Sequence, residues 1–255
     1  MKSTRVGLVT KEWPPQVYGG AGVHAVQLTQ ALRELAGVSV DVHCFGGVRE
    51  DGAFGYSTPA SFADANPAVQ AIATDLEIAN NLQNVNVIHS HTWYANMAGH
   101  FGSLLHGIPH VITAHSLEPL RPWKADQLGG GYQISSWAEK SAYESADAII
   151  AVSDGMRADV LAAYPNVDPA KVVTIRNGVD VDRFKPTTDT ALLAELGIDG
   201  RYAIFVGRIT RQKGLAHLLR AWQNVPAEYG LVLAAGSPDE ETIGNEVKGL
   251  IEELQ

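Results

Sequence analysis

The sequence predicts an α/β protein with two Rossmann-like, doubly wound domains, of which the second is incomplete in this chain. The main observation is that short β-branched runs alternate with helical patterns over residues 5–175, as in βαβ units that form a mostly parallel sheet. A turn-rich stretch with a proline at residues 177–186 interrupts this alternation. A new series starts near Tyr202 but supplies only two strands by residue 255, which is too few for a doubly wound domain.

The individual elements follow from these runs in chain order. In the first domain we expect strands at residues 5–10, 38–44, 85–89, 110–114, 148–152 and 172–175. We expect helices there at about 22–35, 67–82, 94–106, 131–145 and 154–163. In the second domain we expect strands at 202–206 and 231–235 and helices at about 214–224 and 239–254. These elements predict a first domain over residues 1–180, a linker over 181–195 and the start of a second domain over 196–255.

The composition indicates an enzyme of metabolism rather than a nucleic-acid-binding protein. The net charge is −9, with 19 Lys and Arg against 28 Asp and Glu, so no basic stripe is available for a phosphate backbone. The single cysteine, Cys44, is expected to be a buried reduced thiol, which favours a cytoplasmic location. Residues 1–10 lead directly into a strand, and no apolar run approaches the roughly 18 residues of a membrane span. We expect neither a signal peptide nor a membrane anchor.

Two strand–loop–helix units carry loops suited to an anion. Ligands of open α/β sheets bind outside the carboxyl ends of the strands, so the strand at 202–206 should deliver Arg208 to the rim and Lys213 to the first turn of the next helix. The N-terminal loop after residue 10 contains Gly19 and Gly20, which let backbone N–H groups approach a phosphate. The sequence therefore predicts a diphosphate ligand held in a cleft between the two domains.

Seven motifs, in a fixed order along the chain, carry a family resemblance. They are Lys-Glu-Trp-Pro-Pro from residue 11 with Gly-Gly-Ala-Gly-Val-His at 19–24, His-Ser-His-Thr-Trp-Tyr at 89–94, Thr-Ala-His-Ser-Leu-Glu-Pro at 113–119, Arg-Pro-Trp-Lys at 121–124, Gln-Leu-Gly-Gly-Gly-Tyr at 127–132, Asn-Gly-Val-Asp at 177–180 and Gly-Arg-Ile-Thr-Arg-Gln-Lys-Gly at 207–214. With these motifs the whole chain resembles the first two-thirds of actinobacterial glycogen synthases, which belong to the retaining, two-domain GT-B class of glycosyltransferases.

The resemblance implies a reaction and leaves alternatives open. It implies transfer of glucose from ADP-glucose to the 4-hydroxyl of an α-1,4-glucan, with the anomeric configuration retained, in glycogen biosynthesis. Some close relatives use glucose 1-phosphate as the acceptor and make maltose 1-phosphate, and the sequence does not separate the two. Another retaining transferase of the same architecture is a further alternative. A glucan- or nucleotide-binding fragment without catalysis is the alternative from a different class, and the sequence is compatible with an oligomer.

The resemblance also assigns roles on the donor side. Gly207, Arg208 and Lys213 match the residues that hold the donor diphosphate, where fixed cations stabilise the charge of the leaving group without a metal or cofactor. Gly19 and Gly20 match the loop that faces the donor. No enzyme nucleophile is implied, because the leaving phosphate itself helps to deprotonate the acceptor. A paired-glutamate motif of the family lies beyond this chain, so we expect residues 1–255 alone to be inactive.

Other residues are assigned to the sugar and the acceptor. His115 follows the strand at 110–114 and matches the family's sugar-contacting histidine. The acceptor-side candidates are Lys11, His91, Tyr94, Arg121 and Lys124. Arg121, Trp123 and Lys124 form, with Trp137 and Glu139, an aromatic and charged patch, or else a merely structural one. Glu118 is interpreted as a cap or as a partner of Arg121.

Two motifs that suggest metal ligands are interpreted as structural. His89 and His91 lie two residues apart at a strand end, and we expect alternation to point them to opposite faces without a further ligand nearby. Asp180 and Asp182 follow Asn177-Gly178, which we expect to form a tight turn, with the aspartates as caps. The sequence therefore predicts no bound metal.

Overall fold

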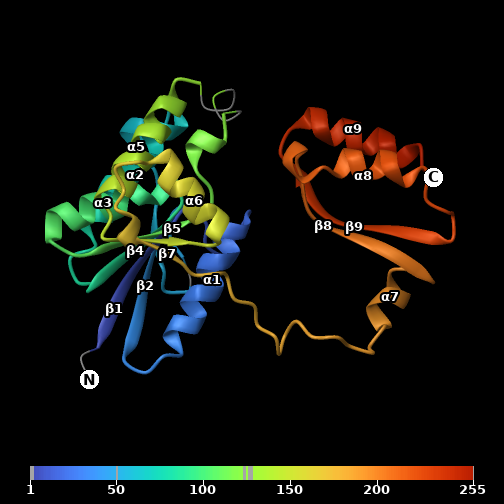
Figure 1. Ribbon diagram of the computed structural model, residues 1–255, viewed down its shortest axis with the longest axis horizontal. Helices are drawn as coiled ribbons and strands as arrows, with labels where there is room; N and C mark the ends of the chain where they lie inside the picture. Colours follow the sequence, from blue (N-terminus) through green and yellow to red (C-terminus); the bar gives the residue numbers. More distant parts are fainter. Residues whose placement is uncertain (1–2, 50, 123–124, 126–128, 255) are drawn as a thin grey trace. The chain divides into compact units, whose positions relative to one another are not determined.

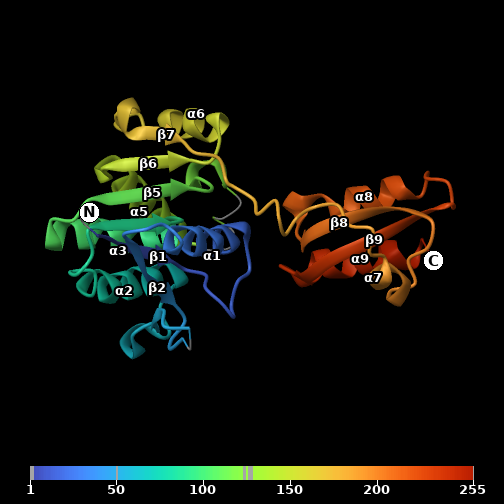
Figure 2. The ribbon, with the colours of Figure 1, turned by 90° about the horizontal axis from the view of Figure 1, so that it is seen from below.

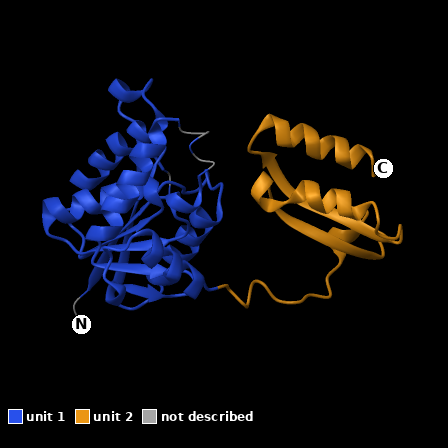
Figure 3. Ribbon diagram, turned by 45° about the horizontal axis from the view of Figure 1, so that its top comes forward, with its two compact units in different colours: residues 1–178 blue, residues 179–255 orange. Residues whose placement is uncertain are grey.

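The chain forms two compact units. The computed structural model describes residues 3–49, 51–122, 125 and 129–254, and it divides into unit 1, Met1–Gly178, and unit 2, Val179–Gln255 (Figure 3). Within the described residues no helix is long and apolar enough to cross a membrane.

Unit 1 is built on a sheet of seven parallel strands. The strands are β1 (Thr4–Thr10), β2 (Val38–Phe45), β3 (Phe54–Tyr56), β4 (Val87–His91), β5 (His110–Ala114), β6 (Ala148–Ala151) and β7 (Val172–Thr174) (Figure 1). Their order is β3-β2-β1-β4-β5-β6-β7, and every neighbouring pair is parallel. Figure 2 shows β5, β6 and β7 side by side. The predicted α/β class is confirmed, and among the strands of the described residues the short β3 was not predicted.

Helices cover the sheet of unit 1. They are α1 (Gly20–Arg33), α2 (Pro67–Asn80), α3 (Trp93–His106), α5 (Gly131–Ser145) and α6 (Asp154–Ala163) (Figure 1). Unit 1 also contains the short 3₁₀ helices η1 (Ala60–Phe62), η2 (Glu118–Leu120) and η3 (Pro169–Lys171). The helix ends agree with the expected ranges to within a few residues, because caps mark them: Asn66 accepts from the Ala68 N–H with Pro67 at the first turn, and Ser153 accepts from the Met156 N–H.

Strand β1 is largely apolar because both of its faces are buried. Leu8 packs in a cluster with Ala25 of α1, whereas the next residue, Val9, packs in a second cluster with Ile78 of α2 and Ala95 of α3. Successive strand residues point to opposite faces, so both faces of β1 are covered by helices. Unit 1 is therefore a doubly wound sheet. The predicted burial of Cys44 is confirmed, since it is fully buried and free among the apolar residues on the α1 side.

Unit 2 contains two parallel strands and three helices. The strands are β8 (Arg201–Ile209) and β9 (Tyr229–Pro238), the helices are α7 (Ala191–Glu195), α8 (Leu215–Trp222) and α9 (Glu241–Glu252), and η4 (Arg211–Lys213) is a 3₁₀ helix. Its core consists of Leu215, Leu219, Ile243 and Val247 with their neighbours. Both strands are longer than predicted, and α7 lies inside the expected linker at 181–195.

The junction between the units differs locally from the prediction. The turn falls at residues 181–183 rather than at Asn177-Gly178. The Asp180 carboxylate Oδ1 accepts hydrogen bonds from the backbone N–H groups of Asp182 and Arg183, each at 3.0 Å. The interpretation of Asp180 as a cap is confirmed. The turn lies at residues 181–183 because the Asp180 carboxylate, and not the Asn-Gly pair, holds the backbone there.

Candidate active site

The sheet of unit 1 has one topological switch point. From β1 the chain winds outward through β2 and β3 on one side, and from β4 it winds outward on the other. Open α/β sheets bind ligands at such a point, outside the carboxyl ends of the strands. Thr10 and His91 are register partners at the ends of β1 and β4. Lys11 and Thr92 are therefore the first residues beyond the switch point.

Lys11 and Tyr94 meet at this edge. The Lys11 Nζ lies 3.7 Å from the centre of the Tyr94 ring, a cation–π contact, and the Tyr94 ring stacks on Trp93 with centroids 4.1 Å apart. Burial lowers the pKa of the Lys11 ammonium, and the neighbouring Glu12 carboxylate acts in the opposite direction. The structure thus brings two acceptor-side candidates together, and their role stays a prediction.

The glycine loop at the start of α1 holds a carboxylate. The backbone N–H groups of Tyr18 and Gly19 donate to Glu12 Oε2 at 2.8 and 2.6 Å. A Cβ placed on Gly22 would lie 2.6 Å from Glu12 Oε2 and 2.7 Å from Glu12 Cβ, so this glycine makes room for the glutamate. In this structure the Gly19 N–H is thus bonded to Glu12, and the contact of this loop with a donor phosphate stays a prediction. Sequence reasoning missed Glu12, although its place in the Lys-Glu-Trp motif was a signal.

Three histidines gather beside this loop. His24 of α1, His91 at the end of β4 and His115 after β5 place one ring nitrogen each within 4.8 Å of one another. The His91 Nδ1 and the His115 Nε2 are 3.1 Å apart and share a hydrogen bond. His89 lies behind His91, with ring centroids 4.5 Å apart, and its Nε2 hydrogen-bonds the Thr113 hydroxyl at 2.7 Å.

This arrangement corrects the expectation that His89 and His91 point to opposite faces. Side chains two residues apart in a strand share a face, and β4 runs two residues further than predicted, so both histidines lie inside it. Burial is the largest cause of the shifts that lower the pKa of His89 to about 4 and that of His115 to about 3, and it lowers the pKa of His24 and of His91 as well. The cluster is therefore a group of neutral imidazoles at pH 7.

Thr92, between β4 and α3, carries backbone strain. Its φ is 67° and its ψ is 157°, a region that is essentially restricted to glycine. Its hydroxyl oxygen is buried and lacks a hydrogen-bond partner among the described residues. The strained residue turns the chain sharply from His91 into α3, which begins with Trp93 and Tyr94. Strain of this kind is commonly found at functional sites.

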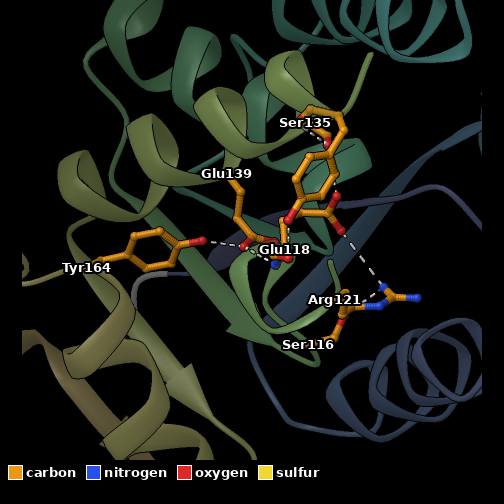
Figure 4. Close-up of polar contacts among 7 residues, drawn as sticks. Ser116, Glu118, Arg121, Ser135, Glu139 and Tyr164 are labelled. Atoms are coloured by element: carbon orange, nitrogen blue, oxygen red, sulfur yellow. Dashed lines mark hydrogen bonds and ion pairs between the residues drawn. The ribbon is translucent and has the colours of Figure 1, made fainter. Parts of the chain in front are cut away.

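A buried carboxyl network lies after β5 (Figure 4). Glu118 and Glu139 are 1% and 2% exposed, and the Glu118 N–H donates to Glu139 Oε1 at 2.7 Å. The Tyr164 hydroxyl also donates to Glu139 Oε1, and the Ser135 hydroxyl donates to Glu118 Oε2 at 2.8 Å. Burial raises the pKa of Glu139 to about 8, and the hydrogen bonds from the Tyr164 hydroxyl and the Glu118 N–H act in the opposite direction. Glu139 is therefore largely protonated at neutral pH.

Arg121 closes this network toward the surface. Its Nη1 lies 3.9 Å from Glu118 Oε1 and donates to the Ser116 hydroxyl at 3.2 Å, which confirms the interpretation of Glu118 as a partner of Arg121 (Figure 4). The predicted aromatic and charged patch is wrong in part, because Glu139 is buried, whereas Trp137 is 56% exposed. Lys124, the remaining acceptor-side candidate, lies outside the described residues together with Trp123.

In unit 2 the donor-side candidates lie at the end of β8. Arg208 opposes two residues of β9 at an irregularity in the ladder, and such irregularities re-aim side chains. Its Nη1 lies 3.4 Å from Oδ2 of Asp239, the residue after β9. Lys213 ends η4, whose start is capped by the Thr210 hydroxyl, and α8 begins only at Leu215. The expectation that Lys213 lies in the first turn of the next helix is therefore wrong by two residues.

Fold and site together define a class: an α/β protein with a Rossmann-like sheet, polar groups at the switch point, and a second unit that starts another parallel sheet. Comparison with known proteins identifies the family. Residues 18–183 match Glycosyltransferase Family 4, and the chain belongs to this family.

Two curated relatives match along nearly the whole chain. The alpha-maltose-1-phosphate synthase of Mycolicibacterium smegmatis is 52% identical over 255 residues, and that of Mycobacterium tuberculosis is 49% identical over the same length. Each match covers 98% of this chain and 65% of the relative, so the chain spans just under two thirds of their length. The structure of the Anabaena protein HepE in complex with UDP-glucose superposes with a TM-score of 0.76 at 15% identity, over 98% of this chain and 66% of that one, which shows a shared fold.

Proposed function

We propose that this chain belongs to a retaining glucosyltransferase that makes maltose 1-phosphate from ADP-glucose and glucose 1-phosphate. The observation that carries the proposal is the 52% identity to a maltose-1-phosphate synthase over 98% of the chain. Of the two acceptors that the sequence leaves open, this relationship favours glucose 1-phosphate over an α-1,4-glucan. The acceptor-side candidates agree with a phosphorylated acceptor, since Lys11 and Arg121 are both cationic.

The proposed reaction exchanges one bond for another. The bond from the glucose anomeric carbon to the diphosphate oxygen breaks, and a bond from this carbon to the acceptor 4-oxygen forms on the same face. The proton of the acceptor hydroxyl leaves with the diphosphate, so the products are maltose 1-phosphate and ADP. Arg208 and Lys213 would stabilise the charge that grows on the diphosphate, so we propose that no metal or cofactor takes part in the chemistry.

Neutral groups suit the sugar side of the same reaction. The anomeric carbon becomes positively charged as the donor bond breaks, and a cationic histidine beside it would oppose this change. The neutral His115, held by its hydrogen bond to His91, can instead accept a hydrogen bond from or donate one to a sugar hydroxyl. We assign it to positioning the transferred glucose. The buried free thiol of Cys44 agrees with a reducing compartment, and we propose a cytoplasmic enzyme without a nucleic-acid partner.

Product analysis on purified protein of measured intact mass tests the proposal. The protein is incubated with ADP-glucose and either glucose 1-phosphate or glycogen, and the products are identified by mass spectrometry. We expect maltose 1-phosphate and ADP from a protein that has the full length of its relatives, and no turnover from residues 1–255 alone. Extension of glycogen with no maltose 1-phosphate would contradict the proposed acceptor, and use of UDP-glucose only would contradict the proposed donor.

A further inference from the structure

Three histidines from three separate segments converge at the carboxyl edge of the unit 1 sheet. His24, His91 and His115 are far apart in sequence, yet one ring nitrogen of each lies within 4.8 Å of the other two. Among the described residues, no carboxylate or thiol joins this group. An all-imidazole set favours borderline transition-metal ions such as Zn²⁺ over Mg²⁺ or Ca²⁺, which prefer oxygen ligands.

The spacing of the nitrogens suits a tetrahedral ion. With metal–nitrogen bonds of about 2.0 to 2.1 Å, two ligand nitrogens of such an ion lie about 3.3 Å apart. The His91 Nδ1 and the His115 Nε2 are 3.1 Å apart before any ion binds. His24 would have to approach them by at most about 1.5 Å to complete the set. A half-buried side chain on the first turns of α1 can supply this movement by a small side-chain rotation.

The chemical state of the rings is also that of metal ligands. Burial lowers the pKa of all three histidines, so their imidazoles are neutral, as metal binding requires. The Nε2 of His24 is buried and lacks a hydrogen-bond partner among the described residues, whereas the Nδ1 of His91 is bonded to His115. Buried polar atoms of this kind are rare in folded proteins, and a water molecule or a bound ion can satisfy them.

A fourth histidine, His89, lies beside the cluster but is not one of its ligands. The Nε2 of His89 is hydrogen-bonded to the Thr113 hydroxyl at 2.7 Å. The His89 ring contacts the cluster by packing against the ring of His91. Three protein ligands remain, which is the number found in zinc sites that keep an exchangeable fourth position.

We propose that His24, His91 and His115 bind one divalent transition-metal ion, with water in the fourth position. The ion is not a cofactor of the transfer reaction. An ion on His115 Nε2 would replace the hydrogen bond to His91 that holds this ring, so it would change how His115 meets the glucose. This consequence rests on the proposed function, whereas the metal site itself does not.

The test measures Zn²⁺ and Co²⁺ binding to the full chain without any sugar. Isothermal titration with Zn²⁺ should give one tight site per chain, and Co²⁺ should give the visible absorption bands of a tetrahedral site. His24→Gln should weaken Zn²⁺ binding about tenfold or more, since one of three ligands is lost. The control is His217→Gln, because His217 is exposed on α8 in the other unit, and it should bind as the wild type does.

Three results would overturn the proposal: no tight site in the wild type, Co²⁺ bands of octahedral type only, or equal affinity in the His24→Gln and His217→Gln variants. Far-UV circular dichroism and the urea midpoint establish that each variant is folded. His91→Gln serves as a second variant that should lose the site in the same way. Because no substrate is present, failure of the transferase assay leaves this test unaffected.

Discussion

The two edges that carry the candidate site residues, one in each unit, are built in different ways. At the carboxyl edge of unit 1, the polar groups are largely buried and neutral: the imidazoles of His91 and His115 are uncharged, and Glu139 retains its proton. At the end of β8 in unit 2, Arg208 and Lys213 are partly or fully exposed cations. A neutral, desolvated edge suits the positioning of sugar hydroxyls, whereas exposed fixed cations suit a diphosphate. We therefore propose that unit 1 positions the sugars and that unit 2 holds the diphosphate.

The largest expected effect comes from removing a fixed cation. Arg208→Ala should lower kcat for ADP release from ADP-glucose by about 100- to 1,000-fold, because the diphosphate charge loses its stabilising partner. Arg201→Ala is the matched control. Arg201 is an exposed arginine at the start of the same strand, bonded to the Tyr229 hydroxyl, and its loss should leave kcat unchanged. Equal losses in both variants would indicate a general effect on unit 2 and contradict the role of Arg208.

The protonation of Glu139 gives a test of whether the edge of unit 1 is neutral. Its pKa is about 8 in the folded protein and near 4.5 when exposed, so between these values the folded state holds a proton that the unfolded state has lost. The contribution of Glu139 to stability therefore falls as the pH rises from 4.5 to 8, by roughly a few kcal/mol. Glu139→Gln keeps an oxygen to accept the bonds from Glu118 and Tyr164 and cannot ionise.

Urea unfolding at pH 5 and pH 8 measures this difference. The stability of Glu139→Gln relative to the wild type should rise with pH. The reason is that the wild type loses the contribution of the buried, protonated Glu139 as the pH rises, whereas glutamine does not titrate. Comparison of the two proteins removes the contributions of other groups, such as the buried histidines, whose lowered pKa values act in the opposite direction. Parallel pH dependences in both proteins would show that Glu139 is ionised in the fold.

The glycine loop allows a test of close packing. Gly22→Ala should destabilise unit 1 by about 1–3 kcal/mol, because the new methyl group would meet Glu12 at 2.6 Å and displace the carboxylate from the Gly19 N–H. Gly20→Ala is the matched control, since a Cβ there meets nothing within 4 Å. It should be neutral or slightly stabilising. Urea midpoints compare the two, and equal midpoints would disprove the role of Gly22.

The smallest expected effect concerns the strained turn. Thr92→Gly should relieve the strain of the positive φ and, after the entropic cost of glycine, stabilise unit 1 by about 1 kcal/mol. Thr92→Ala keeps a Cβ and should show no such gain. Melting temperatures of the two variants give the comparison. A lower melting temperature for the glycine variant than for the alanine variant would contradict the strain.

The sequence predicted the fold of unit 1 well and its site only in part. The period of the apolar residues marks strands and helices, and caps such as Asn66 and Ser153 mark their ends, so local patterns sufficed there. Glu12 escaped prediction because its role depends on a contact with Gly19 and Gly22 that spacing does not reveal. The histidine cluster was hidden for a related reason: His24 joins it from α1, and its neighbours come from β4 and the end of β5.

The division of work between the units can be tested by ADP binding, measured by isothermal titration to the full-length protein and two variants. If exposed cations of unit 2 hold the diphosphate, Arg208→Ala should weaken ADP binding about tenfold or more, since a charge-assisted hydrogen bond is lost. His115→Ala should bind ADP as the wild type does, because we propose that the neutral edge of unit 1 contacts the sugars and not the diphosphate. A loss of ADP affinity in His115→Ala as large as that in Arg208→Ala, or none in Arg208→Ala, would contradict the account.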